Sequence, residues 1–317
     1  MVAKILVTSR SFGQVSDEPI NLLKQNGFII DFKKEEELYT EEEFAKIIGQ
    51  YDAVIVGADP MTAKVIEAGR NLKIICKHGA GVDNIDCKKA KEMGILVTNV
   101  PATNSDAVAD FTFGLIIDIA RRISESVCKV KTGKWDRYIG VDIFKKTLGI
   151  VGYGAIGRRV ARRAIGFDMK VLAYDPYVNS DNNNNFVNFT DLDTLIRESD
   201  FISIHVPLNE STKHLIQDSK MRQMKQGAFI INAARGGIVD EEALYRNLLN
   251  GHLGGAALDV IEHEPLGNNP LVNLDNVIIT SHIASYSKEA INAVSMTCTR
   301  NVVKFFKGEK PDNVVNE

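Results

Sequence analysis

The chain is poor in the features that mark nucleic-acid-binding and membrane proteins. Its 38 lysines and arginines are balanced by 41 aspartates and glutamates, so the formal net charge of −3 offers no basic surface for nucleic acid or an anionic membrane. No apolar run reaches the roughly 18 residues of a membrane span. Residues 1–7 are typical of a first strand rather than of a signal peptide, because the run is short and leads into turn residues. We therefore expect neither a nucleic-acid nor a membrane partner.

Cysteine is also scarce, and the usual catalytic or metal signatures are missing. The four cysteines lie far apart with no C-x-x-C pair: Cys76, Cys87, Cys128 and Cys298. Buried reduced thiols are the default for such spacing, which predicts a cytoplasmic protein without disulfides or a bound metal. The sequence has no H-E-x-x-H pattern and no Ser-His-Asp order. These absences argue against a zinc hydrolase or a serine hydrolase.

The length and the order of patterns predict two α/β domains. At 317 residues the chain exceeds one typical domain, and 44% hydrophobic with 25% charged residues is ordinary for a globular protein. Over residues 1–99, short apolar strands alternate with helical patterns, which indicates a parallel sheet covered by helices. This first domain contains no phosphate-binding glycine motif.

A glycine motif follows much later, within residues 148–157. An apolar strand pattern runs into Gly152, Gly154 and Gly157 at G-x-G-x-x-G spacing, a helical pattern comes next, and a second strand ends at Asp175. Glycines permit the tight turn, a helix N-terminus favours a pyrophosphate, and a carboxylate binds ribose hydroxyls. Because a carboxylate repels a 2′-phosphate, Asp175 favours NAD over NADP. The alternative, a glycine turn without a ligand, fits this complete context less well.

Polar side chains follow several strands beyond the motif. Arg235, Asp259 and His282 each come directly after, or close to, the end of an apolar strand. Ligands of open parallel sheets bind beyond the carboxyl ends of the strands, so we expect these side chains to face one crevice. Taken singly, each could instead be a solvated or structural residue.

These residues suggest a hydride-transfer site. Arg235 has a guanidinium fork suited to a carboxylate, and His282 is a natural proton carrier near neutral pH. Glu264, which precedes Pro265, could hydrogen-bond His282 and favour its protonated form. His263 is a competing candidate base because it neighbours Glu264, whereas His214 and His252 are interpreted as surface residues.

Two further segments carry expectations. Residues 104–131 show a long, unusually apolar helical pattern, which we interpret as a helix shared between two domains or two subunits; the alternative is an ordinary core helix. Residues 179–188 are polar and rich in asparagine, and we interpret them as a surface loop without chemistry.

The motifs together resemble the D-isomer-specific 2-hydroxyacid dehydrogenases. Within that family they are most similar to the short form of the D-3-phosphoglycerate dehydrogenases. The motifs are K-H-G-A-G-V-D-N-I-D at 77–86, N-V-P at 99–101, the glycine turn, H-V-P-L at 205–208, N-A-A-R-G-G at 232–237, L-D-V at 258–260 with E-P at 264–265, and S-H at 281–282.

The resemblance implies a discontinuous arrangement of two doubly wound parallel-sheet domains. A Rossmann cofactor domain, residues 100–286, would be inserted into a flavodoxin-like catalytic domain made of residues 1–99 and 287–317. The long helix after Asn104 resembles the family's dimer helix, so a homodimer is expected.

The resemblance also assigns the site residues. Arg235, Glu264 and His282 would be catalytic, and the loop of His78, Gly79, Ala80 and Gly81 would hold the substrate carboxylate beside Arg235. NAD would contact Gly152, Gly154, Ala155, Ile156, Gly157, Asp175, His205, Val206, Pro207, Thr212, Ala233, Ala234 and Asp259, the last through the nicotinamide carboxamide.

The implied activity is an NAD-dependent transfer of hydride between nicotinamide and C2 of a small anionic 2-hydroxy or 2-keto acid. Phosphoglycerate is the leading substrate, with glyoxylate, hydroxypyruvate or another 2-keto acid as the alternative. A non-catalytic NAD-sensing protein is a distant third hypothesis. One departure concerns the substrate: phosphoglycerate enzymes carry an arginine after the third strand, where this chain reads V-G-A-D-P at 56–60.

Overall fold

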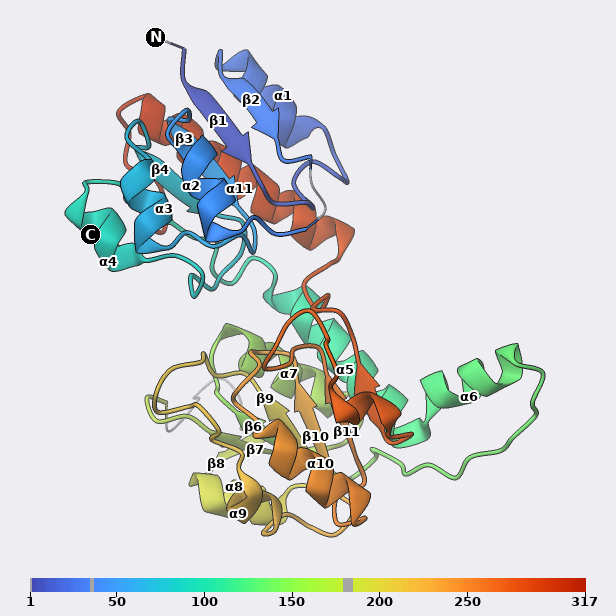
Figure 1. Cartoon of the computed structure of the whole chain (residues 1–317). Helices are drawn as coiled ribbons and strands as arrows, with labels where there is room; N and C mark the ends of the chain where they lie inside the picture. The colour runs from blue at the N-terminus through green and yellow to red at the C-terminus, as the bar shows by residue number, and fades with distance from the viewer. Residues whose placement is uncertain (1, 35–36, 179–184) are drawn as a thin grey trace. The chain divides into compact units, whose positions relative to one another are not determined.

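The computed structural model describes residues 2–34, 37–178 and 185–317 and divides into two compact units. Unit 1 consists of Met1–Asn104 and Tyr286–Glu317, and unit 2 consists of Ser105–Ser285 (Figure 1). The chain therefore leaves unit 1, forms all of unit 2 and returns. The sequence-based boundaries, at 99/100 and 286/287, differ from these by a few residues.

Unit 1 is a parallel sheet with helices on both faces. Its strands follow the order β2-β1-β3-β4-β5 within the described residues, the order of a flavodoxin-like sheet. They are β1 (Lys4–Val7), β2 (Ile29–Phe32), β3 (Ala53–Val56), β4 (Ile74–Lys77) and β5 (Leu96–Thr98). The helices are α1 (Glu18–Gln25), α2 (Glu41–Ile48), α3 (Ala63–Ala68), α4 (Cys87–Glu92) and α11 (Lys288–Phe306).

Local sequence explains how these elements begin and where they pack. Thr40 starts α2 through a capping box: its side chain accepts from the Glu43 N–H, and the Glu43 side chain accepts from the Thr40 N–H. Two apolar layers bury the sheet, one against α2 to α4 and the other against α11. The last helix of the chain thus completes the first domain.

Unit 2 is a larger parallel sheet of Rossmann type. Its strands follow the order β12-β11-β10-β9-β6-β7-β8 within the described residues. They are β6 (Thr147–Val151), β7 (Lys170–Tyr174), β8 (Val187–Phe189), β9 (Phe201–Ile204), β10 (Phe229–Asn232), β11 (Gly255–Leu258) and β12 (Val277–Ile279). Around them lie α5 (Ser105–Arg121), α6 (Ile123–Lys131), α7 (Ala155–Ile165), α8 (Leu192–Glu198), α9 (Asp218–Met221), α10 (Glu241–Leu249) and the 3₁₀ turn η1 (Pro270–Asn273).

The long helix expected over residues 104–131 is wrong in one respect, because it is broken into α5 and α6. Arg122 has a left-handed backbone with φ of 54°, and the Asp118 carboxylate accepts a hydrogen bond from the Ser124 N–H at 2.7 Å. An apolar pattern cannot reveal such a break, since both helices keep helical spacing. α5 packs on α7 and on strands β10 and β11, so it belongs to unit 2.

The loop expected over residues 179–188 is also partly wrong. Residues 179–184 lie outside the described part of the chain, and Val187 begins β8, which pairs in parallel with β7. This edge strand has only three residues, which is too short a pattern to predict a strand from the sequence. Within the described residues, no helix is both long and apolar enough to cross a membrane.

Candidate active site

The glycine turn connects β6 to α7 at the point where the strand order of unit 2 reverses. Gly152 has a φ of +96°, and a Cβ there would lie 2.7 Å from the His205 carbonyl carbon. A Cβ at Gly157 would lie 2.1 Å from the Gly152 oxygen, so neither position accepts another residue. Apart from its two chain neighbours, none of the described residues lies within 4 Å of a Cβ placed at Gly154, and α7 begins at the next residue. This is the open helix N-terminus that a pyrophosphate requires.

Asp175 follows β7 and lies beside the turn. Its carboxylate accepts from the Tyr153 N–H at 2.8 Å and from the Tyr177 N–H at 2.8 Å. An ionised carboxylate has about four acceptor positions, so these two bonds fix its orientation and leave capacity for hydroxyl donors. The position and chemistry of Asp175 fit a ribose.

His205 follows β9 on the other side of the turn. Its Nε2 is hydrogen-bonded to the Ser203 hydroxyl at 2.8 Å, whereas Nδ1 is buried and has no hydrogen-bond partner among the described residues. Burial lowers the pKa of His205 to about 3, so the ring is neutral. A buried polar atom without a partner usually receives one from a ligand or water. Together with the glycine turn and Asp175, this residue fits a dinucleotide.

The loop after His205 is held by its own polar groups. The Thr212 hydroxyl donates to the Pro207 oxygen at 2.6 Å, and the Asn209 N–H donates to the same hydroxyl at 2.8 Å. Val206 packs against the core formed by the sheet of unit 2. The expected cofactor residues of this segment are therefore brought to the same edge of the sheet as the glycine turn.

Asn232, which sequence reasoning did not single out, shapes the loop that carries Arg235. Its buried side chain accepts from the Ala234 N–H at 3.1 Å and donates to the Arg235 oxygen at 2.9 Å. The Arg235 guanidinium donates to the Ala234 oxygen at 2.7 Å. The signal in the sequence was an amide residue directly before the loop, at the end of β10.

His282 and Glu264 meet as expected: the distance from His282 Nδ1 to Glu264 Oε2 is 2.8 Å, and the side chains are 48% and 39% exposed. Burial raises the pKa of Glu264, but the hydrogen bond and charge of His282, the Ile261 N–H and the charge of Arg235 outweigh it, so the net shift is downward. Glu264 is therefore ionised at neutral pH. An ionised acceptor requires that Nδ1 carry the proton, which leaves Nε2 for exchange. The structure shows this contact for His282 rather than for His263.

His282 itself has a left-handed backbone, with φ of 55°. The His282 N–H donates to the main-chain oxygen of Asp259 at 2.9 Å. The Asp259 carboxylate is buried and accepts from the Thr280 hydroxyl at 2.6 Å, the Ile283 N–H at 2.9 Å and the Ala284 N–H at 2.8 Å. Asp259 therefore holds the loop that presents His282. Its expected contact with the nicotinamide carboxamide stays a prediction.

The predicted substrate loop lies in unit 1, after β4. His78 Nε2 is hydrogen-bonded to the Ser295 hydroxyl of α11 at 2.9 Å, and burial, aided by the charge of Lys77, lowers the pKa of His78 to about 4. The Val100 N–H donates to the Gly79 oxygen at 2.8 Å, and the Asn99 amide donates to the Ala80 oxygen at 2.6 Å. The ring of His78 is thus a neutral anchor of the loop.

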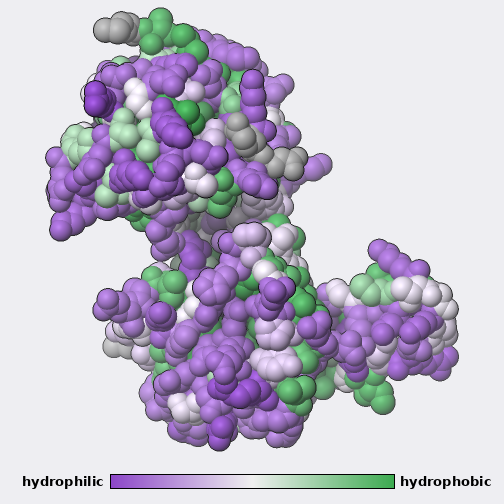
Figure 2. All heavy atoms as spheres, viewed as in Figure 1, coloured by the Kyte–Doolittle hydropathy of each residue, from purple (hydrophilic) through white to green (hydrophobic). Residues whose placement is uncertain are grey.

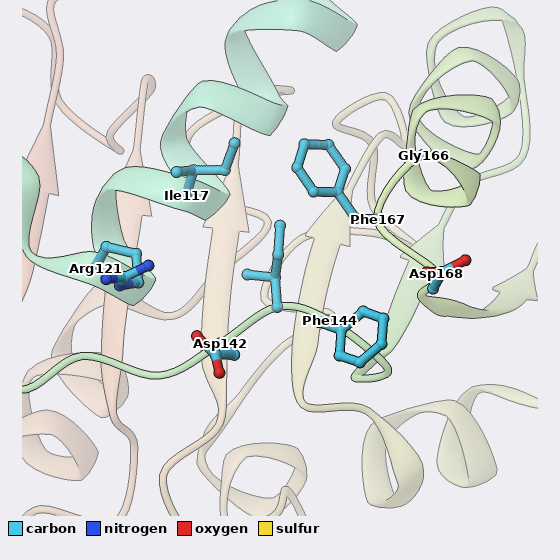
Figure 3. A pocket seen from close by; sticks show the side chains of 8 residues that line it. Ile117, Arg121, Asp142, Phe144, Gly166, Phe167 and Asp168 are labelled. Carbon is cyan, nitrogen blue, oxygen red and sulfur yellow. The ribbon is translucent and has the colours of Figure 1, made fainter.

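A cavity of about 340 Å³ elsewhere in unit 2 contains none of the predicted site residues. It lies between the end of α5, the segment 142–144 and the turn after α7, and Figure 3 shows Phe144 and Phe167 on its wall. No cluster of histidine, cysteine, aspartate or glutamate able to hold a metal occurs within the described ranges. The carboxyl edge of the unit 2 sheet therefore remains the candidate site.

Comparisons with known proteins agree with this fold and site. Residues 113–284 match the model of the D-isomer specific 2-hydroxyacid dehydrogenase NAD binding domain. The chain is 44% identical over 270 residues to a hydroxypyruvate reductase of Thermotoga maritima, covering 83% of this chain and 88% of that protein. It is 41% identical over 315 residues to a glyoxylate reductase of Thermofilum pendens, covering 96% and 93%.

Other relatives carry a different name or have solved structures. A D-3-phosphoglycerate dehydrogenase of Archaeoglobus fulgidus is 40% identical over 307 residues, which are 95% of this chain but 58% of that protein. The structure of D-lactate dehydrogenase from Aquifex aeolicus, complexed with NAD and lactic acid, is similar with a TM-score of 0.83 and 32% identity, covering 99% of each chain.

The fold, the matched domain and these relatives define an NAD-dependent oxidoreductase. The chain belongs to the D-isomer specific 2-hydroxyacid dehydrogenase family. These findings favour an enzyme over the non-catalytic NAD sensor. The relatives divide between two substrate names, so the comparisons leave the particular acid open.

Proposed function

We propose that the chain interconverts a D-2-hydroxy acid and its 2-keto acid, with His282 as the proton carrier. The observation that supports this most directly is the contact of 2.8 Å between His282 Nδ1 and Glu264 Oε2. It orients the imidazole and leaves Nε2 for the substrate oxygen. The proposal predicts that His282→Ala lowers kcat by at least about 100-fold.

NAD, when bound, supplies or accepts the hydride at substrate C2. His282 gives its Nε2 proton to the oxygen that becomes the hydroxyl, and takes it back in the reverse direction. Glu264 holds the imidazolium through Nδ1. Arg235 binds the substrate carboxylate and polarises the carbonyl.

The residues proposed to hold NAD divide by the part of the cofactor they suit. The turn of Gly152, Gly154, Ala155, Ile156 and Gly157 would hold the pyrophosphate, and Asp175 would bind the ribose hydroxyls. The remaining positions are His205, Val206, Pro207 and Thr212 near the adenine, with Ala233, Ala234 and Asp259 near the nicotinamide. Of these, His205 is distinguished by its buried, unbonded Nδ1 among the described residues.

For the substrate we propose a small unphosphorylated 2-keto acid, glyoxylate or hydroxypyruvate. Lys33 and Asp59, which follow β2 and β3 at the carboxyl edge of unit 1, form a buried ion pair with side chains 4% and 1% exposed. Asp59 also accepts from the Tyr39 N–H at 2.9 Å, and Lys33 lies 4.0 Å from the Tyr39 ring centroid. A buried carboxylate neutralises the lysine, which reduces the attraction of this edge for a phosphate.

Lys77 at the end of β4 supports the same conclusion. Its amine donates to the Gly57 oxygen at 2.6 Å and to the Asn84 side-chain oxygen at 2.7 Å. These bonds tie the amine to the segments that follow β3 and precede α4 in its own unit. 3-Phosphohydroxypyruvate, favoured by the sequence resemblance, is the second candidate.

A steady-state assay with NADH and a panel of keto acids tests the function. We expect turnover with glyoxylate and hydroxypyruvate, and a lower kcat/KM with 3-phosphohydroxypyruvate. The double variant Lys33→Met with Asp59→Leu removes both charges, and the ranking of the keto acids by kcat/KM should stay the same. A higher kcat/KM with the phosphorylated acid would reverse the substrate proposal, and failure to reduce any 2-keto acid while NADH binds would overturn the proposed reaction.

We also propose a homodimer formed through α6 and the segment after it. All residues of α6 are described and none is buried, and α6 extends from unit 2 on an arm (Figure 1). Figure 2 shows apolar side chains among polar ones on this arm. The exposed apolar residues include Ile123, Val127, Val130, Trp135, Ile139 and Phe144, with Trp135 81% and Ile139 95% exposed. So much exposed apolar surface on one segment is typical of an interface.

Light scattering after size-exclusion chromatography tests the dimer. Val127→Asp with Val130→Asp should give a monomer, whereas Leu249→Asp, an exposed apolar position on α10, should not. A wild-type chain that stays monomeric at micromolar concentration would refute this proposal.

A further inference from the structure

His214, interpreted from the sequence as a surface residue, has a specific partner in unit 2. Its Nε2 lies 2.5 Å from Glu262 Oε1, with the two side chains 39% and 28% exposed. The His214 backbone is left-handed, with φ of 49°, and its N–H donates to the Gly237 oxygen at 2.8 Å. His214 therefore contacts both the loop after β10 and the loop after β11.

Glu262 is held from a second direction. Its N–H donates to the Glu241 carboxylate at 2.6 Å, and the other oxygen of that carboxylate accepts from the Asn269 amide at 2.7 Å. Burial raises the pKa of Glu241, against the lowering effect of these two hydrogen bonds. The side chain of Glu262 is thus bound to His214 and its backbone to the start of α10.

Glu262 lies two residues before Glu264, in a loop that bends tightly. The Ile261 N–H faces Glu264 Oε1 at 3.4 Å, while Glu264 Oε2 bonds to His282. The Arg235 loop packs directly on this bend, because a Cβ at Gly236 would lie 1.9 Å from the Ile261 oxygen. Glu262 and the carboxylate that contacts His282 therefore belong to the same bend, and the Arg235 loop packs on it.

We propose that His214 and Glu262 are a pair of positioning residues that hold the Glu264 loop where its carboxylate meets His282. The pair joins three loops: the loop that contains Thr212, the loop that contains Arg235, and the loop that contains Glu264. A side-chain contact this exposed contributes little to global stability, so its effect lies in the geometry of the loop. The inference rests on the proposed function of Glu264 and His282.

Single and double variants test the pair in the full-length protein with NADH and the best keto acid. We expect His214→Ala and Glu262→Ala each to lower kcat about 10-fold, with KM and the NADH dissociation constant within about 3-fold of wild type. The double alanine variant should be no slower than either single variant, because each change removes the same contact. His214→Gln and Glu262→Gln, which keep a donor and an acceptor, should recover most of the lost rate.

His252→Ala is the matched control. This half-buried histidine of unit 2 also has side-chain partners, with Nδ1 3.2 Å from Gln226 Oε1 and Nε2 2.9 Å from the Met221 oxygen, and neither partner belongs to the three loops. We expect its kcat to equal that of wild type. Unchanged kcat in His214→Ala and Glu262→Ala would overturn the inference, as would equal losses in the alanine and glutamine variants or additive losses in the double variant.

Nuclear magnetic resonance of the His282 ring separates this inference from the proposed function. The ¹⁵N shifts of His282 should change in His214→Ala but not in His252→Ala, whether or not a substrate has been found. A wild-type chain inactive with every keto acid refutes the function alone. An active wild type with unchanged His282 shifts in His214→Ala refutes the positioning pair alone.

Discussion

Replacing Glu264 by glutamine tests the central contact of the proposed mechanism. The change keeps the size of the side chain and removes its charge, so the hydrogen bond to His282 at 2.8 Å becomes a neutral one. A hydrogen bond to a charged group contributes roughly 1.5–3 kcal/mol, against about 1 kcal/mol for a neutral one. The difference is about 0.5–2 kcal/mol, and because the side chains are 48% and 39% exposed, we expect a loss at the low end, about 0.5–1 kcal/mol. That corresponds to a fall in kcat of about 2- to 5-fold.

The effect has a defined dependence on pH. The pKa of Glu264 lies below its ordinary value of 4.5, so the wild-type carboxylate is charged at every pH above about 4.5. Its contribution is therefore constant in that range and is lost as pH falls through the lowered pKa. The ratio of wild-type to variant kcat should be flat above pH 5 and should shrink below pH 4.5.

Stopped-flow measurement of NADH oxidation with saturating keto acid gives the rate for each variant. Glu242→Gln is the matched control, because Glu242 is an exposed glutamate of unit 2 that pairs with Arg246 at 2.6 Å on α10. The control should leave kcat unchanged. If Glu264→Gln turned over as fast as wild type, Glu264 would not act through His282 and the proposed mechanism would fail.

The remaining predictions concern the cofactor turn, the His282 loop and acid stability. Gly157→Ala should weaken NADH binding at least about 10-fold by fluorescence titration, because its Cβ would lie 2.1 Å from the Gly152 oxygen; Gly166→Ala, with its nearest contact at 3.5 Å, should bind normally. Asp259→Asn leaves one of the N–H groups of residues 283 and 284 unpaired and should lower the free energy of unfolding in urea by about 1–3 kcal/mol. Burial lowers the pKa of His78 to about 4 and that of His205 to about 3 in the folded chain, against an ordinary 6.5. The unfolded chain therefore binds protons at a higher pH than the folded chain, and the free energy of unfolding should fall as pH drops from 6.5 toward 4. In His205→Asn the free energy of unfolding should fall less steeply with pH, and an unchanged slope would contradict the lowered pKa of His205 in the folded chain.

Short-range patterns predicted most of the fold. The glycine turn separates β6 from α7 at the expected residues, and the first domain alternates strands and helices as expected. The alternation of strands and helices indicated two parallel sheets. These features depend on residues a few positions apart, whose preferences act before any tertiary contact forms.

Other features needed the tertiary structure. The break at Arg122 depends on a left-handed residue and on the Asp118 carboxylate that caps α6, and neither changes the apolar spacing on which the single helix was predicted. The three-residue strand β8 exists because β7 offers it an edge. The Asp259 carboxylate is held against the His282 loop by hydrogen bonds from Thr280 and Ala284, which lie more than 20 positions away in the sequence.

The sequence by itself determined the order of the elements, the glycine turn and the polar residues at the strand ends, because backbone preference and parallel pairing act on local patterns. It also indicated that Glu264 could meet His282, although only the structure showed the distance. The pairing of His214 with Glu262, separated by 48 positions, was decided by the tertiary structure alone. Two loops that each look like ordinary surface come into contact only because β9 and β11, with β10 between them, end at the same edge of the parallel sheet.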